Sequence, residues 1–143
     1  MINKFRGKIL DGDGHFEYGD LLYDRDKNPF IHFFDCNNFE CLYEIIPESI
    51  GQYTGLKDKN GIEIYENDIL LLTSDIYTNF GRFKTDRIDK TVKQVIWNID
   101  TWATKVIKSN LTVVGSQSNG LTIAIKYAEV IGNIYENSNL LEG

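Results

Sequence analysis

The chain has 143 residues and a mass of 16.4 kDa, with 42% hydrophobic and 25% charged residues. This size and composition are typical of one globular domain, and they exclude disordered and fibrous proteins. The net charge of −6 disfavours a nucleic-acid-binding or anionic-membrane surface over the whole molecule. No run approaches the roughly 18 apolar residues of a membrane span or follows the pattern of a signal peptide, so we expect a cytoplasmic protein.

Residues 1–47 predict a β-hairpin extension, because apolar and polar residues alternate with a period of two. Runs rich in Asp, Gly and Asn at 11–14 and 24–29 predict the turns, and residues 36–40 are expected to be irregular. Pro47 should end the last strand, because proline cannot donate to a ladder. The predicted strands are residues 4–10, 16–23, 30–34 and 41–46.

Residues 48–143 predict a second run of short strands with little helix. Gly51 and Gly55 leave room for one helical turn at most before the Asn60-Gly61 turn. A bend is expected at Asn67, since asparagine tolerates the left-handed conformation. Residues 74–90 predict a long mobile loop and 115–120 a flexible one. The predicted strands are residues 62–65, 68–72, 91–98, 103–108, 111–114, 121–125 and 127–135.

One continuous stretch and its partial echo form the most specific motif of the chain. Residues 47–72 read PESIGQYTGLKDKNGIEIYENDILLL, and the IYEN core returns in VIGNIYEN at residues 130–137. These stretches resemble the YopX family, small proteins encoded by phages and prophages of Gram-positive bacteria, whose members have no assigned activity. The matching positions are Gly51, Gln52, Tyr53, Thr54, Gly55, Leu56, Asp58, Gly61, Ile64, Tyr65, Glu66, Asp68, Ile131, Gly132, Asn133, Tyr135, Glu136 and Asn137.

The resemblance implies an SH3-type small β-barrel or roll over residues 48–143. Residues 1–47 would then be an N-terminal β-hairpin extension packed on that core in one compact unit. The family usually has glycine at the position of Asn67, and this substitution keeps the expected bend possible. From the repeated IYEN we expect Tyr65 and Tyr135 to be largely buried in the same barrel.

The Asp-Gly-Asp-Gly run at residues 11–14 resembles the beginning of a calcium-binding loop. His15, Phe16 and Leu22 occupy the positions that should carry Asp or Asn, Gly and finally Glu. The pattern therefore favours a plain hairpin turn over a calcium site.

Cys36 and Cys41 are expected to be free thiols, because two cysteines make no disulfide framework in a chain of this length. With His15 and His32 they would supply four zinc ligands, yet no close C-x-x-C pair is present, so ordinary core cysteines are favoured. Either cysteine as a nucleophile with either histidine as a base is the only such catalytic pairing that these residue types offer. Nothing in the sequence places them together. We expect no metal and no cofactor.

Carboxylates near the two IYEN segments raise a second catalytic hypothesis, because paired carboxylates support acid and base chemistry. We favour a structural interpretation, in which Glu66 and Asp68 cap exposed backbone N–H groups at turns. The chain also lacks a phosphate-binding loop and a dinucleotide fingerprint, so we expect no enzyme and assign no catalytic residue. The carboxylates concerned are Glu63, Glu66, Asp68 and Glu136.

Residues 82–108 combine basic and aromatic side chains, a pattern that favours single-stranded nucleic acid by stacking and phosphate contact. The competing interpretation is that the tryptophans are core residues and the lysines protect edge strands, and the acidic whole chain favours it. The candidate residues are Arg82, Lys84, Arg87, Lys90, Lys93, Trp97 and Trp102.

The sequence thus favours a non-catalytic interaction or assembly module of a phage or prophage, with single-stranded nucleic-acid binding second and an enzyme of unknown type third. We expect a homo-oligomer, most simply a dimer. The 8 Phe, 8 Tyr and 2 Trp and several strand edges leave more apolar surface than one small barrel covers. An unknown phage or host protein is the other expected partner; nucleic acid and membranes are not expected.

Overall fold

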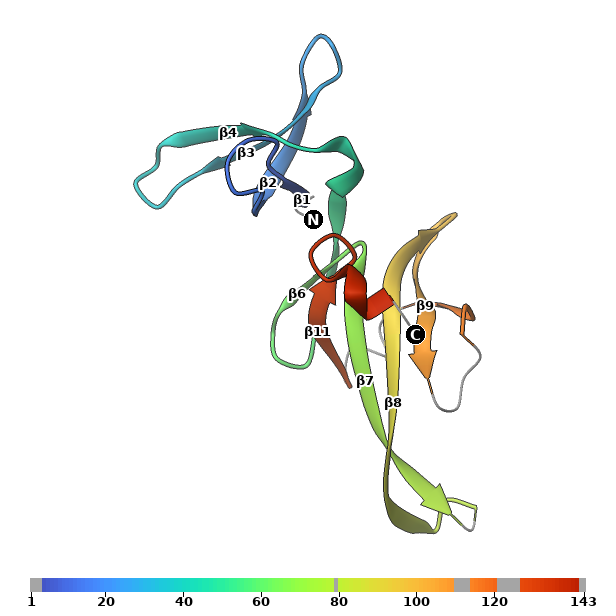
Figure 1. Cartoon of the computed structure of the whole chain (residues 1–143). Coiled ribbons are helices and arrows are strands. Elements are labelled where there is room, and N and C mark those ends of the chain that lie inside the picture. The colour runs from blue at the N-terminus through green and yellow to red at the C-terminus, as the bar shows by residue number, and fades with distance from the viewer. Residues whose placement is uncertain (1–3, 79, 110–113, 121–126, 142–143) are drawn as a thin grey trace. The chain divides into compact units, whose positions relative to one another are not determined.

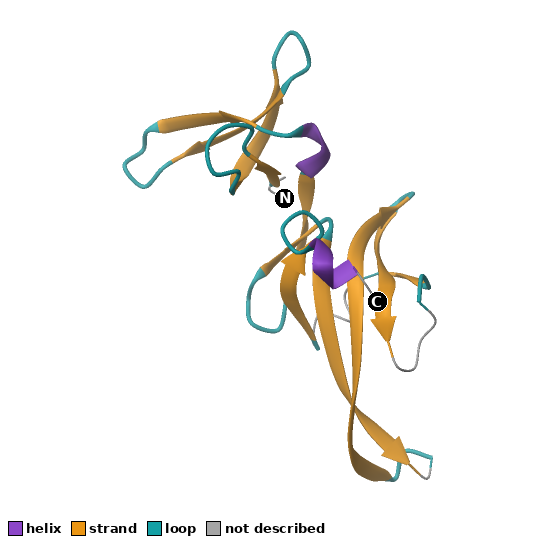
Figure 2. Cartoon of the chain, viewed as in Figure 1, coloured by secondary structure: helices purple, strands orange, loops and turns teal. Residues whose placement is uncertain are grey.

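The protein is mainly β in a computed structural model that describes residues 4–78, 80–109, 114–120 and 127–141 (Figures 1 and 2). Two short 3₁₀ turns, Pro47–Ser49 and Ser138–Leu141, are the helical elements of these residues. Little helix was expected, and this is confirmed for the described part of the chain. None of its helical elements is long and apolar enough to cross a membrane.

The chain divides into two units, Met1–Tyr53 and Thr54–Gly143. The predicted boundary, after residue 47, lies slightly before this division of the chain. The difference arises because β5, the strand that follows the first 3₁₀ turn, begins in the first unit. That the two units form one compact body stays a prediction.

The first unit is an antiparallel sheet in the order β4-β3-β2-β1-β5. All four strands predicted in residues 1–47 are present, and β2 has the predicted bounds. A bridge between Ile9 and Ile45 continues the pairing past the ends of β1 and β4. The strands are β1 (Phe5–Lys8), β2 (Phe16–Tyr23), β3 (Pro29–Phe34), β4 (Glu40–Glu44) and the first residues of β5 (Gly51–Lys57).

Strand β5 was not predicted, because Gly51 and Gly55 have low strand propensity and Gly55 adopts a positive φ of 85°. Its first residues pair with β1 through Gln52 opposite Phe5. This tertiary pairing overrides the local preference. The single helical turn allowed by the sequence is the 3₁₀ turn just before it.

The two faces of the first sheet differ in burial. One face carries the core of the unit, in which Ile9, Ile31 and Ile45 are buried and Phe5 and Leu21 pack against them. The opposite face of β2, β3 and β4 stays uncovered, and large apolar side chains on it are exposed. We call it the outer face; its apolar members are Tyr18, Leu22, Phe34 and Leu42.

The second unit is an antiparallel sheet in the order β10-β9-β8-β7-β11, and β6 pairs with the end of β5. Among the described strands, β10 and β11 lie at opposite edges and do not pair with each other. The sheet is therefore open, and the expected SH3-type barrel is not confirmed. The strands are β6 (Glu63–Tyr65), β7 (Asp68–Thr78), β8 (Phe83–Asn98), β9 (Thr101–Ser109), β10 (Gln117–Asn119) and β11 (Ala128–Asn133).

Two loop predictions in this unit are wrong. Residues 74–90 form the far part of β7 and β8, which run past the ends of β9 and β11 as a two-stranded ribbon (Figure 1). The described side chains at its far end are largely exposed on both strands, so no alternation of polarity marked them in the sequence. Residues 115–120 contain β10, which pairs with β9. The strands predicted at 111–114 and 121–125 lie, except for Val114, outside the described residues.

The core of the second unit joins β6, β7, β8 and β11. Ile64, Leu70, Val95 and Ala128 are buried together. Tyr65 is 2% exposed, as expected. The prediction was only partly right for Tyr135, which belongs to the same unit but is half-buried.

Candidate functional site

Asp58 is a residue of the family motif that lies in the turn between β5 and β6 and binds backbone groups of two segments. Its Oδ1 atom accepts hydrogen bonds from the backbone N–H groups of Asn60, at 2.8 Å, and Ile62, at 2.9 Å. Its Oδ2 atom accepts a third from the N–H of Val130 on β11, at 2.9 Å. One carboxylate therefore closes the turn and fixes a strand 72 residues further along the chain.

The electrostatics of Asp58 fit an anchor rather than an acid catalyst. Burial acts to raise the pKa of its carboxyl, but the backbone N–H donors of Val130, Ile62 and Asn60 outweigh burial and hold the pKa below its ordinary value. The carboxylate is ionised at neutral pH. A general acid needs the opposite shift, towards the working pH.

Asn67 connects three parts of the second unit from a left-handed conformation, with φ at 68°. Its backbone N–H donates to the carbonyl of Val95, and its own carbonyl accepts from the N–H of Ile134. Its side-chain amide donates to the hydroxyl of Tyr135 at 2.8 Å and accepts from the amide of Gln94 at 3.0 Å. The bend predicted at Asn67 is confirmed, and it brings the two IYEN segments into contact.

Asp68 and Asn133 cap backbone groups at the two IYEN turns. The buried Asp68 carboxylate accepts from the N–H of Tyr65 at 2.8 Å, which confirms the predicted cap. Asn133 Oδ1 accepts from the N–H groups of Tyr135, at 3.0 Å, and Glu136, at 2.9 Å. The motif thus holds turns and strands together, and Glu136 lies exposed at the second turn.

The predicted ligand types do not assemble into a metal centre in the described residues, where no group of three or more His, Cys, Asp or Glu side chains is placed to hold an ion. His15 instead bridges two carboxylates: its Nδ1 contacts Asp13, and its Nε2 lies 2.6 Å from Glu17 Oε1. Hydrogen bonds to Asp13 and Glu17 raise the pKa of His15. The residues at 11–14 form the expected turn.

The two cysteines are free thiols, as predicted, but the expectation that they are core residues is wrong. Cys36 is exposed and Cys41 is half-buried, because Cys36 lies in the connection between β3 and β4 and Cys41 near the start of β4, rather than in the core of the sheet. Partial burial, followed by the negative charges of Asp35 and Glu17, raises the pKa of the Cys41 thiol. A raised pKa keeps this sulfur protonated at neutral pH, and a thiol is a poor nucleophile.

The basic and aromatic residues predicted for nucleic acid are divided between the two ends of β8. Arg82, Lys84 and Arg87 are exposed near the tip of the ribbon. Trp97 lies at the far end of the strand, where its half-exposed ring meets Trp102 edge to face at 4.9 Å. At roughly 3.3 Å per residue, Lys84 and Trp97 are separated by about 40 Å along this strand.

Of the remaining predicted side chains, Lys90 and Lys93 lie between these ends, and Trp102 lies opposite Trp97 on β9. Lys90 is exposed on the ribbon, and Lys93 is half-buried further along β8. Trp102 packs against the core of the unit. The structure therefore presents two separate surfaces, one basic and one aromatic, in place of a single stacking groove.

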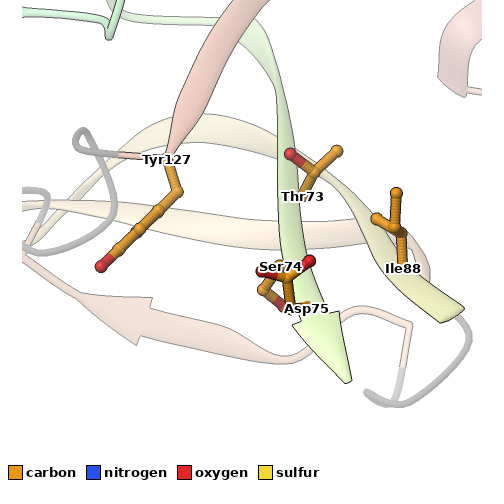
Figure 3. A pocket seen from close by; sticks show the side chains of 5 residues that line it. All are labelled: Thr73, Ser74, Asp75, Ile88 and Tyr127. Carbon is orange, nitrogen blue, oxygen red and sulfur yellow. The ribbon is translucent and has the colours of Figure 1, made fainter. Parts of the chain in front are cut away.

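A hollow of about 350 Å³ lies at the base of the ribbon (Figure 3). Thr73, Ser74 and Asp75 reach it from β7, Ile88 from β8, and Tyr127 from the residue before β11. Its hydroxyl groups can form hydrogen bonds, and the one carboxylate of its described lining, Asp75, lies 3.5 Å from Lys84 Nζ. No sequence pattern predicts this hollow, because these residue types are ordinary for strands.

Exposed apolar side chains on the ribbon form the surface feature that sequence reasoning missed. Phe80 is fully exposed in the turn, and Phe83 and Ile88 on β8 are 61% and 54% exposed. Arg82 and Lys84 lie beside them; Lys84 Nζ is 3.5 Å from Asp75 Oδ2. The available signal was the presence of large apolar residues such as Phe80, Phe83 and Ile88 within the predicted loop.

A family profile and a solved structure match the chain. The sequence profile of the YopX protein family matches residues 4–142. The crystal structure of protein EF1440 from Enterococcus faecalis is similar over 99% of both chains, with 25% sequence identity and a TM-score of 0.51. No curated protein matches the chain.

The Asn67 hub yields a paired prediction. Asn67→Ala removes both side-chain hydrogen bonds and keeps a residue with a Cβ at positive φ, so the free energy of unfolding should fall by about 2 to 3 kcal/mol. Asn67→Gly removes the same bonds but relieves the backbone, and should be about 1 kcal/mol more stable than the alanine variant. Urea denaturation measures both; equal stabilities of the two variants would contradict the left-handed geometry.

Proposed function

The chain belongs to the YopX family, and we propose that it is a non-catalytic interaction or assembly module of a phage or prophage, acting in the cytoplasm of the bacterial host. The β7–β8 ribbon carries this proposal. A two-stranded ribbon is only marginally stable alone in water, and this one exposes Phe80, Phe83 and Ile88. A partner that covers these side chains would remove apolar surface from water and stabilise the ribbon.

The chemistry of the motif supports a non-catalytic role. Asp58 and Asp68 accept backbone hydrogen bonds that hold the second unit together. The lowered pKa of Asp58 and the raised pKa of Cys41 are both opposite to what a general acid and a thiolate nucleophile require. An enzyme remains the third hypothesis.

Self-association is the simplest form of this function. At micromolar concentration, light scattering should give a mass of two or more chains, because pairing would cover the exposed ribbon. Phe80→Ser combined with Phe83→Ser should shift the mass towards one chain. Phe39→Ser is the control, since Phe39 is also an exposed ring, in the connection between β3 and β4 of the first unit. A wild-type mass of one chain would contradict the prediction.

Single-stranded nucleic-acid binding is the second candidate, and the half-exposed Trp97 ring favours it. An exposed indole beside a second ring offers a platform on which a base can stack. The separation of Trp97 from Arg82 and Arg87 weakens this hypothesis, because one short strand would contact either the platform or the basic tip.

Titration of a fluorescent single-stranded oligonucleotide decides between the two candidates. We expect no binding tighter than roughly 100 micromolar at physiological salt, the weak end of non-specific association. Sub-micromolar, salt-sensitive binding would favour the second candidate. It should then be lost when Arg82, Lys84 and Arg87 are all changed to Glu, and weakened by Trp97→Ala.

A further inference from the structure

We propose that the ribbon of one copy docks on the outer face of the first unit of a second copy, so that the chains assemble head to tail. This inference rests on the proposed assembly function and names the two surfaces that meet. The ribbon contributes Phe80, Phe83 and Ile88, and the outer face contributes the apolar side chains of β2, β3 and β4.

Strand pairing places the members of the outer face on one side of the sheet. Asp20, His32 and Leu42 lie opposite one another on β2, β3 and β4. Two positions away, Tyr18 and Phe34 point to the same side, because side chains alternate along a strand. Phe34 and Leu42 are 59% and 53% exposed. A sheet face that leaves several large apolar side chains exposed is a candidate interaction site.

Acidic side chains are interspersed with the apolar ones on this face. Asp20, Glu40 and Glu44 share it, by the same alternation and pairing. The His32 ring lies between two of them, with Nε2 at 3.1 Å from Glu40 and Nδ1 at 3.6 Å from Asp20. Residues 1–53 as a whole hold 10 Asp and Glu against 5 Lys and Arg. The outer face therefore suits an apolar partner that carries positive charge.

The ribbon tip has that composition. Between residues 80 and 88, Arg82, Lys84 and Arg87 stand among the exposed apolar side chains, with Asp86 as the only acid. All four of these charged side chains are exposed. Apolar surface on both partners supplies the driving force, and the opposite charges select the orientation.

Charge also disfavours the symmetric alternatives. Two outer faces in contact would bring acidic side chains together, and two ribbons in contact would bring arginines and lysines together, both of which are unfavourable. A contact between the ribbon of one copy and the outer face of another brings opposite charges together. Since two different patches meet, repetition of the contact gives a closed ring, of which a reciprocal dimer is the smallest, or an open filament.

Charge reversal tests this pairing by sedimentation and light scattering over a range of concentrations. The ribbon variant changes Arg82, Lys84 and Arg87 to Glu, and the face variant changes Asp20, Glu40 and Glu44 to Lys. Each should weaken self-association about tenfold or more, because like charges then meet. A single chain with all six changes restores opposite charges and should assemble like the wild type.

A matched control reverses three acids of the same unit away from the outer face, Asp11, Asp26 and Glu48, which are all exposed. It should leave assembly unchanged, and thermal unfolding verifies that each variant is folded. If the protein assembles but the ribbon and face variants assemble as the wild type does, or the six-change chain stays dissociated, the head-to-tail contact is wrong and the assembly function stands. A monomeric wild type would overturn both.

Discussion

The second unit depends on one carboxylate that is held by three backbone N–H groups. Asp58 binds the β5–β6 turn to Val130 on β11, next to the point where the register of β11 against β7 shifts. Strand β11 leads directly into the second IYEN turn, which Asn133 caps. That turn places Tyr135 where Asn67 can donate to its hydroxyl. Each contact presupposes the one before it, so the charge on Asp58 organises the motif.

The motif residues that hold the fold together are different from the exposed residues that a partner would contact. The motif residues bind backbone groups, and a buried ionised carboxylate is stable only because it is fully hydrogen-bonded. Chemistry available to a partner then lies outside the motif, on the exposed ribbon and on the outer face of the first sheet. Apolar side chains interspersed with opposite charges on these two surfaces are better explained by recognition between proteins than by catalysis.

Sequence patterns predicted the parts of the chain in which one face is buried and turns carry specific residues. Residues 16–23 alternate in polarity, are flanked by strong turn signals, and form β2. Asn67 is a residue type that tolerates the left-handed conformation of a bend. The β7–β8 ribbon could not be found this way, since neither of its described faces is buried. Strand β5 depends on pairing with β1, which no local pattern records. The candidate interface was missed for the same reason: Phe80 and Phe83 were assigned to a loop.

Titration of the Asp58 carboxyl by carbon NMR, with the Val130 amide followed in parallel, tests the central role of this carboxylate most directly. A lowered pKa means that the ionised form stabilises the fold, so this stability is present above the ordinary pKa of 3.8 and is lost as the pH falls through the folded value. We predict a midpoint below 3.8 and a Val130 amide that shifts with the same midpoint. A midpoint at or above 3.8, with the Val130 amide unmoved, would contradict the account.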